Sequence, residues 1–166
     1  RMSGSVLPVV INSGSGNQGI TVSMPVIVYA QHLGASRERL IRALTISNLV
    51  AIHQKSKVGR LSAYCGAVSA AAGSGAAIAW LDGASHELIE LTISNTLANV
   101  SGILCDGAKP SCAAKIASAV EAALVGYSLA KKQRSFQPGD GIVKGELEET
   151  ISAVGEIASK GMLQTD

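Results

Sequence analysis

The stretch that most restricts how this chain can fold runs from Leu61 to Leu81, LSAYCGAVSAAAGSGAAIAWL, and contains no charged residue. Such a segment of 21 residues must be buried, either in a bilayer or in the core of a protein. Alanine, glycine and serine dominate it, so its transfer into lipid would release little free energy, and serines such as Ser62 and Ser74 are unusual on a lipid-facing surface. We therefore expect no membrane span, and predict that this run is the central helix of a soluble bundle.

The rest of the chain is patterned for further helices. Ser36 and Ser85 each precede apolar residues at helical spacing and can cap a helix, while only the short apolar run at 6–11 could be a strand. The expected fold is all-α, a compact multi-helix bundle with a small-residue-rich central helix, and residues 1–166 form a single helical domain of catalytic type. Besides the central run, the expected helices are residues 20–33, 36–59, 85–100, 113–132 and 146–159.

Composition narrows the classes of partner. A net charge of +2 gives no strong electrostatic field, and five aromatic residues offer few surfaces on which bases could stack, so we expect no nucleic-acid partner and a small-molecule ligand instead. Three cysteines cannot all pair with one another, which favours a reducing, cytoplasmic location and metal or redox chemistry over a disulfide framework. The oligomeric state is open, and a homo-oligomer is compatible with the sequence.

Residues 12–19, NSGSGNQG, form a glycine-serine loop that contains the spacing GxGxxG. A dinucleotide-binding fold would require a second parallel strand after the following helix, but the residues after Gly34 have a capped helical pattern. The glycines would still allow several backbone N–H groups at a helix start to converge on a phosphate or a carboxylate. A plain flexible turn is the alternative interpretation.

The three cysteines are Cys65, Cys105 and Cys112, the last two within the loop CDGAKPSC. Cysteine is often only a small buried apolar residue, and that interpretation stays open. Two details favour a metal site: Cys105 lies outside any apolar stripe, and Cys112 follows Pro110 at a helix start, where the helix dipole and Lys109 favour the thiolate. Zinc fits poorly, because a closed four-ligand site lacks its fourth member, so an iron-sulfur cluster with one open iron is the better metal hypothesis.

Three motifs in this order, SGSGNQGI, GRLSAYCGAVSAAAG and CDGAKPSC, resemble the L-cysteine desulfidase family, which is related to the iron-sulfur L-serine dehydratases. The resemblance covers essentially the whole chain. The chain is similar to the C-terminal part of a longer family member. It implies that Cys65, Cys105 and Cys112 hold a 4Fe-4S cluster whose fourth iron binds substrate. It also implies that the glycine-serine loop contributes the substrate-binding residues, which are Ser13, Gly14, Ser15, Gly16 and Asn17.

The chemistry that the resemblance implies is β-elimination of L-cysteine or L-serine to pyruvate and ammonia, with release of sulfide or water and without pyridoxal phosphate. The open iron would act as a Lewis acid on the leaving group while a base removes the α-proton. Only six residues separate Cys105 from Cys112, a shorter gap than in the dehydratases, which favours the desulfidase branch. His53, Lys55 and Lys57 precede Cys65, but such a cluster more commonly marks a solvated helix end, so the base stays unassigned.

Three functional hypotheses remain at this level. The first is an amino-acid-degrading lyase whose isolated chain is inactive because it needs the missing N-terminal portion of the same protein. The second is an iron-sulfur sensor or regulatory domain without turnover. The third is a helical interaction module with buried cysteines.

Overall fold

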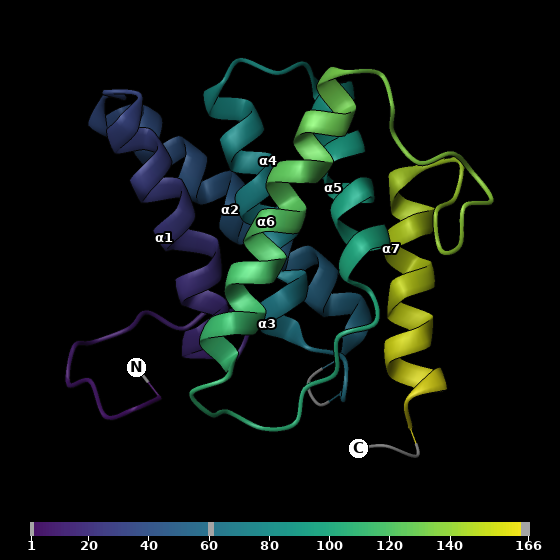
Figure 1. The fold of residues 1–166 in the computed structure, drawn as a ribbon, viewed down its shortest axis with the longest axis horizontal. Helices are drawn as coiled ribbons and strands as arrows, with labels where there is room; N and C mark the ends of the chain where they lie inside the picture. The colour runs from purple at the N-terminus through teal and green to yellow at the C-terminus, as the bar shows by residue number, and fades with distance from the viewer. Residues whose placement is uncertain (1, 60–61, 164–166) are drawn as a thin grey trace.

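The computed structural model describes residues 2–59 and 62–163, and helices make up its regular structure (Figure 1). In this part of the chain there are no β-strands, only two isolated bridges, one within the glycine-serine loop and one between Tyr64 and Leu104. The prediction of an all-α bundle is confirmed. The elements are α1 (Gly16–His32), α2 (Arg37–Val58), α3 (Gly66–Ser69), α4 (Ala71–Leu81), α5 (His86–Val100), α6 (Cys112–Lys131), α7 (Leu147–Glu156) and the π-helical turn η1 (Ile157–Gly161).

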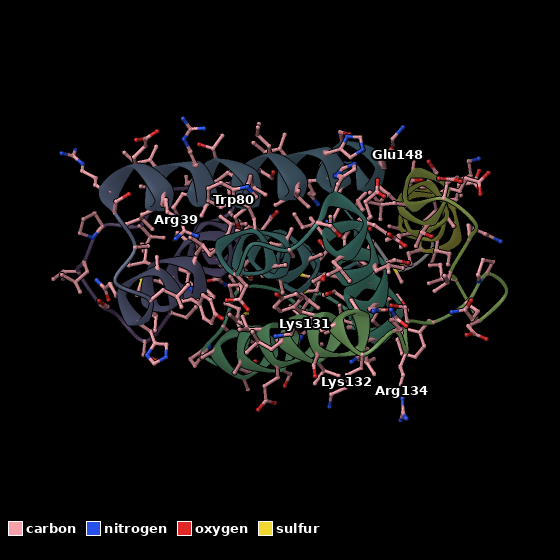
Figure 2. All side chains as sticks on the ribbon, turned by 90° about the horizontal axis from the view of Figure 1, so that it is seen from above. Arg39, Trp80, Lys131, Lys132, Arg134 and Glu148 are labelled. Atoms are coloured by element: carbon pink, nitrogen blue, oxygen red, sulfur yellow. The ribbon has the colours of Figure 1, made fainter. Side chains whose placement is uncertain are left out.

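Helix α4 runs through the middle of the molecule and contacts α1, α2, α5 and α6, while α7 packs at one edge against α2 and α5 (Figures 1 and 2). The small residues of α4 allow its neighbours to pack this closely. A Cβ atom on Gly73 would lie 2.4 Å from the carbonyl oxygen of Ser47 on α2, and one on Gly75 would lie 3.0 Å from the Cβ of Ala123 on α6. The composition of the uncharged run therefore serves close approach of neighbouring backbones.

Local capping defines the helix starts that the sequence predicted. The Ser36 hydroxyl accepts a hydrogen bond from the backbone N–H of Arg39, and the Ser85 hydroxyl accepts one from Leu88, both at 3.3 Å. Each serine thus satisfies an N–H group that has no partner inside the helix. Longer-range contacts then fix the helices to one another: Arg39 donates to the carbonyl of Leu81 at the end of α4, and Glu148 of α7 pairs with His53 of α2 (Figure 2).

Several predicted boundaries were wrong. The run that was expected to form one helix contains two, α3 and α4, and its described residues 62–65 are not helical, because Ala63 and Cys65 form backbone hydrogen bonds with Cys105 and Ile103 instead. Helix α1 begins at Gly16 instead of residue 20, since Ser15 caps it, and Pro25 consequently lies inside the helix. Pro110 precedes α6 by two residues instead of occupying its first position. The run at 6–11 has no regular structure, and its side chains are largely exposed.

Two apolar segments, α4 and α6, were considered as possible membrane spans. Nearly all of α4 is buried among other helices of the bundle, so this part of the uncharged run lies in a protein core. By length and composition, α6 is the one described helix that could cross a bilayer, a test that core helices of water-soluble proteins also pass. Its small-residue face, which includes Ala119, Ala123 and Gly126, is buried in the bundle, where α6 packs against α4 and α5.

Candidate functional site

The glycine-serine loop closes on itself immediately before α1. Asn12 and Ser15 exchange two backbone hydrogen bonds of 3.2 and 3.1 Å, and the chain between them passes through positive φ at Ser13 (50°) and Gly14 (93°). The Ser15 hydroxyl then accepts hydrogen bonds from the N–H groups of Asn17 and Gln18. The loop is therefore a helix-capping turn that is closed by its own backbone hydrogen bonds.

Two tertiary contacts hold this loop in place. The side chain of Asn12 donates to the side-chain oxygen of Asn48 on α2 at 2.8 Å. Residue 19 must be glycine, because a Cβ atom there would lie 1.7 Å from the carbonyl oxygen of Val10. Within the described residues, the backbone N–H groups of Ser13, Gly14 and Gly16 donate no hydrogen bond, so they are available to a ligand.

Cys65 and Cys105 lie on segments that pair antiparallel, although they are far apart in the sequence. The N–H of Cys65 donates to the carbonyl of Ile103 at 3.1 Å, and the N–H of Cys105 donates to that of Ala63 at 2.6 Å. Cys65 is buried at the start of α3, whereas Cys105 is exposed. The fold thus brings together two of the three predicted cluster ligands.

Cys112 is the first residue of α6 and is buried, with its sulfur 3.8 Å from the carbonyl oxygen of Gly107. One turn further along the helix, Lys115 donates to the carbonyl of Leu104 at 2.9 Å and pairs with Asp106. Lys109 also pairs with Asp106, at 3.2 Å. These contacts fix residues 104–107 against the first turn of α6.

Ionisable groups near the cysteines shift one another's pKa values. Burial raises the pKa of the Cys65 thiol, the neighbouring Cys105 raises it further, and Lys115 opposes the shift. The pKa of Lys115 is raised chiefly by its hydrogen bond to Asp106, with smaller contributions from Cys65 and Cys112. Bonds from Lys115 and Lys109 lower the pKa of the Asp106 carboxyl to about 2. Lys115 is thus the cation that interacts with both buried thiols.

The glycine-serine loop and the cysteine segments border one another. A cavity of 330 Å³ is lined by Asn17 and by Cys112. The side chain of Gln18 lies against Gly66, the residue after Cys65, where a Cβ atom would be 2.9 Å from Gln18 Nε2. The first turn of α1 therefore contacts both cysteine-bearing regions. The other residues of this cavity are Met2, Ser3, Ile20, Pro110, Ala113 and Ile116.

The three cysteines supply the thiolate ligands that an iron-sulfur cluster requires. Three cysteine thiols are the number of ligands that a cluster with one open iron requires, and the pairing of residues 63–65 with 103–105 holds Cys65 and Cys105 on adjacent segments. Across residues 2–59 and 62–163, however, no three His, Cys, Asp or Glu side chains are already gathered as a metal-binding group. The residue types and the backbone suit a cluster, and the side chains would have to rearrange to bind one.

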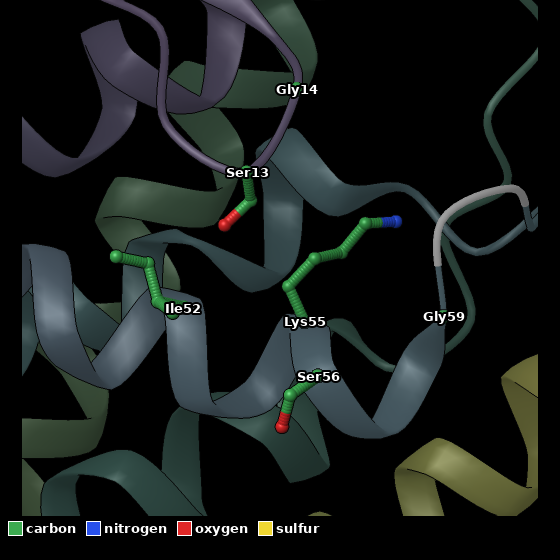
Figure 3. A pocket seen from close by; sticks show the side chains of 6 residues that line it. All are labelled: Ser13, Gly14, Ile52, Lys55, Ser56 and Gly59. Carbon is green, nitrogen blue, oxygen red and sulfur yellow. The ribbon is translucent and has the colours of Figure 1, made fainter.

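A second and larger cavity, of 640 Å³, lies on another side of the glycine-serine loop (Figure 3). Ser13 and Gly14 line it from the loop, and α2 contributes Ile52, Lys55 and Ser56, with Gly59 at its end. In the sequence, Lys55 is only one of three basic residues near a helix end. The signal that could have singled it out is the spacing of positions 52, 55, 56 and 59, which places them on one helical face.

The other two basic candidates serve different parts of the structure. His53 pairs with Glu148 of α7 at 2.8 Å. Lys57 is exposed and lies close to Gly155 of α7, where an added Cβ atom would be 2.7 Å from the Cβ atom of Lys57. Both residues therefore belong to the contact between α2 and α7, and only Lys55 borders the glycine-serine loop.

Comparison with known proteins gives one family and several relatives. The family model described as serine dehydratase alpha chain matches residues 1–166. Similar curated proteins are UPF0597 proteins of Lachnoclostridium phytofermentans (61% identical), Treponema denticola (58%) and Finegoldia magna (55%), each aligned with 100% of this chain. The chain spans 38–40% of the length of these relatives. No solved structure matches it.

Proposed function

The chain belongs to the serine dehydratase alpha chain family, and we propose that it is the iron-sulfur lyase domain of a longer enzyme that performs β-elimination on L-cysteine or L-serine. The observation that carries the proposal is the meeting of three regions: the Cys65 segment, the CDGAKPSC loop and the first turn of α1. The products would be pyruvate and ammonia, with sulfide from cysteine or water from serine.

In this proposal Cys65, Cys105 and Cys112 hold a 4Fe-4S cluster. When bound, such a cluster would supply a Lewis acid for the leaving thiol or hydroxyl. Lys115 supports the assignment, because its ammonium holds residues 104–106 in place and interacts electrostatically with Cys65 and Cys112. A cation at this position offsets the negative charge that three thiolates would bring together.

The remaining chemistry concerns the substrate. Loss of the α-proton to a base leaves its electron pair to form the Cα=Cβ bond, the β-substituent departs and takes up a proton, and water hydrolyses the resulting aminoacrylate to pyruvate and ammonia. We assign substrate binding to Ser13, Gly14, Ser15, Gly16 and Asn17, because this ordered loop offers backbone N–H donors beside the cysteine region. The base is not assigned to any residue of this chain.

The relatives are more than twice as long as this chain, so the activity belongs to the longer protein in our proposal. We propose that the remaining portion completes the active site, that the isolated chain is inactive, and that the enzyme acts in the cytoplasm on a small amino acid.

The test is anaerobic reconstitution of the full-length protein with iron and sulfide, followed by assays of pyruvate with L-cysteine and with L-serine. Pyruvate accompanied by sulfide, with a higher kcat/KM for L-cysteine, supports the desulfidase assignment; a preference for L-serine supports the dehydratase assignment. Cluster uptake without any pyruvate would instead indicate a sensor or regulatory domain. Failure to bind iron would favour the third hypothesis, a helical interaction module with buried cysteines.

A further inference from the structure

Helix α6 has an apolar face that the bundle does not cover. One face packs against α4 and α5, but only 33% of the most apolar stretch of the helix is buried. Between residues 113 and 130 its charged residues are Lys115 and Glu121. Leu124 and Val125 are 42% and 50% exposed. A helix that is apolar on most of its surface is normally covered on both faces by other parts of a protein.

Helix α1 supplies a second apolar wall beside α6. It contains no Asp, Glu, Lys or Arg, and Met24 and Val28 are 49% and 57% exposed. A groove of 480 Å³ lies between the two helices, and the buried Ile78 of α4 also lines it. The remaining lining residues are Met24, Pro25, Val28, Tyr29 and His32 of α1 and Val120 and Leu124 of α6.

This groove continues toward the candidate site. Its lining residues and those of the smaller cavity that contains Cys112 follow one face of each helix, at positions 17, 20, 24 and 28 of α1 and positions 112, 116, 120 and 124 of α6. Residues three or four apart share a helical face, so the two hollows lie along one α1–α6 groove with Cys112 at one end. The fifteen-residue span of α1 from Asn17 to His32 gives it a length of roughly 22 Å, which matches a helix of about four turns.

The other side of the bundle has a mixed surface. Figure 2 shows α2 and α6 on opposite sides of α4. The exposed residues of α2 include Leu49 and Ile52, but also Glu38 and Arg42, which form an ion pair at 2.8 Å. Charged and apolar side chains are thus interspersed on α2, whereas the α1–α6 groove is continuous and apolar.

We infer that the α1–α6 groove is the docking site for an amphipathic helix from the part of the longer protein that lies outside residues 1–166. This chain spans 38–40% of its curated relatives, so most of each relative lies outside it. A segment of the same polypeptide is present at a high effective concentration, and an apolar helix face fits an apolar groove. A second copy of this chain would present the same concave surface, which does not fill a groove.

The inference deepens the proposed function, because it states where the remaining portion meets this chain. A helix along the α1–α6 groove would have one end over the cavity that Asn17 and Cys112 line. It would thereby exclude water from that cavity. Only this consequence rests on the proposed function, since docking itself requires no reaction.

The experiment is photo-crosslinking in the full-length protein, with benzoylphenylalanine in place of Val28 or of Leu124. These two exposed residues lie on opposite walls of the groove. After illumination and digestion, mass spectrometry should show that both positions crosslink, within one polypeptide, to the same short stretch outside residues 1–166. The matched control is the same replacement at Arg42, an exposed residue of α2, which should not give this product.

A second pair of variants tests whether the groove must be apolar. In the protein that carries the crosslinker at Val28, Leu124→Glu should lower the crosslinking yield about 10-fold or more, because docking would bury a charge without a partner. Leu124→Met keeps the size and the apolar character and should retain the yield. Leu124 is exposed in this chain, so neither substitution disturbs its core, and circular dichroism checks that the fold is kept.

Four results would overturn the inference. They are crosslinks to residues 1–166 of a second copy, crosslinks to phospholipid when vesicles are present, different target stretches for Val28 and Leu124, and yields at both positions as low as at Arg42. The readout does not depend on turnover. The expected crosslinks in a reconstituted protein that makes no pyruvate would refute the lyase and retain the docking site, and pyruvate formation without these crosslinks would do the reverse.

Discussion

The side chain of Gln18 lies directly against Gly66, close enough that a Cβ atom at position 66 would be 2.9 Å from Gln18 Nε2. This contact joins the helix that starts at the glycine-serine loop to the residue that follows Cys65. Because Gln18 is buried and Gly66 is half-buried, packing sets the spacing between the predicted substrate loop and the first predicted cluster ligand. Glycine at 66 lets the end of the Gln18 side chain lie this close to the segment that carries Cys65.

The first prediction compares two glycines. Gly66→Ala should lower the free energy of unfolding by less than about 1 kcal/mol, because the end of a Gln18 side chain can move aside, whereas Gly73→Ala should cost about 3 kcal/mol. At Gly73 the obstacle is the backbone carbonyl of Ser47, 2.4 Å from the new Cβ atom, and it cannot rotate away. Urea denaturation measures both values. Similar losses in the two variants would mean that the contact between Gln18 and Gly66 is as rigid as backbone packing.

The second prediction concerns cluster binding. Anaerobic reconstitution should give a brown protein with about four irons per chain. Single replacement of Cys65, Cys105 or Cys112 by serine should abolish or greatly reduce iron and sulfide uptake, since each supplies one of three thiolates. Ser111→Ala, at the exposed residue beside Cys112, is the control and should retain full iron content. Normal iron in all three serine variants would exclude a cluster on these cysteines.

The third prediction separates the structural role of a helix cap from a role in binding. Ser15→Ala and Ser85→Ala each remove a hydroxyl that accepts from N–H groups at a helix start, so each should lower the unfolding free energy by about 1 kcal/mol. Only Ser15 belongs to the glycine-serine loop. In the reconstituted full-length protein, Ser15→Ala should therefore raise the substrate KM, while Ser85→Ala should not. An unchanged KM in Ser15→Ala would reduce this loop to a helix cap.

The fourth prediction concerns high pH. The Tyr29 hydroxyl donates to Asp82 at 2.5 Å, and this bond, with burial and the Asp82 charge, raises the pKa of Tyr29 from its usual value of 10 to about 12. Because the folded-state pKa is the higher one, the stability that this bond contributes is fully present below pH 10 and is lost as the pH rises toward 12. Because burial also raises the pKa values of Tyr64 and Tyr127, ultraviolet titration should show all three tyrosines ionising late, and Tyr29→Phe should remove the contribution of one of them. In Asp82→Asn, Tyr29 should ionise nearer to its usual pKa; an unaltered titration there would contradict the assignment.

The sequence by itself determined the fold class and most helix boundaries. Ser36 and Ser85 were recognisable as caps because the bond that each makes spans only three residues, and a local interaction leaves a local signal. The uncharged run likewise had to be buried, since no arrangement of neighbours would make 21 such residues a favourable exposed surface. The three cysteines and the motifs around them are also visible in the sequence. The family resemblance could therefore be recognised without the structure.

Tertiary structure decided the rest, because those features depend on contacts between residues far apart in the chain. The non-helical residues before α3 have no local signal that distinguishes them from helix, because their conformation depends on hydrogen bonds with Ile103 and Cys105. Lys55 and Lys57 are equivalent in type and nearly so in position, yet only the directions of their side chains, fixed by how α2 packs, put the first beside the glycine-serine loop and the second beside α7. A helix sequence specifies which residues share a face, and its neighbours decide what that face meets.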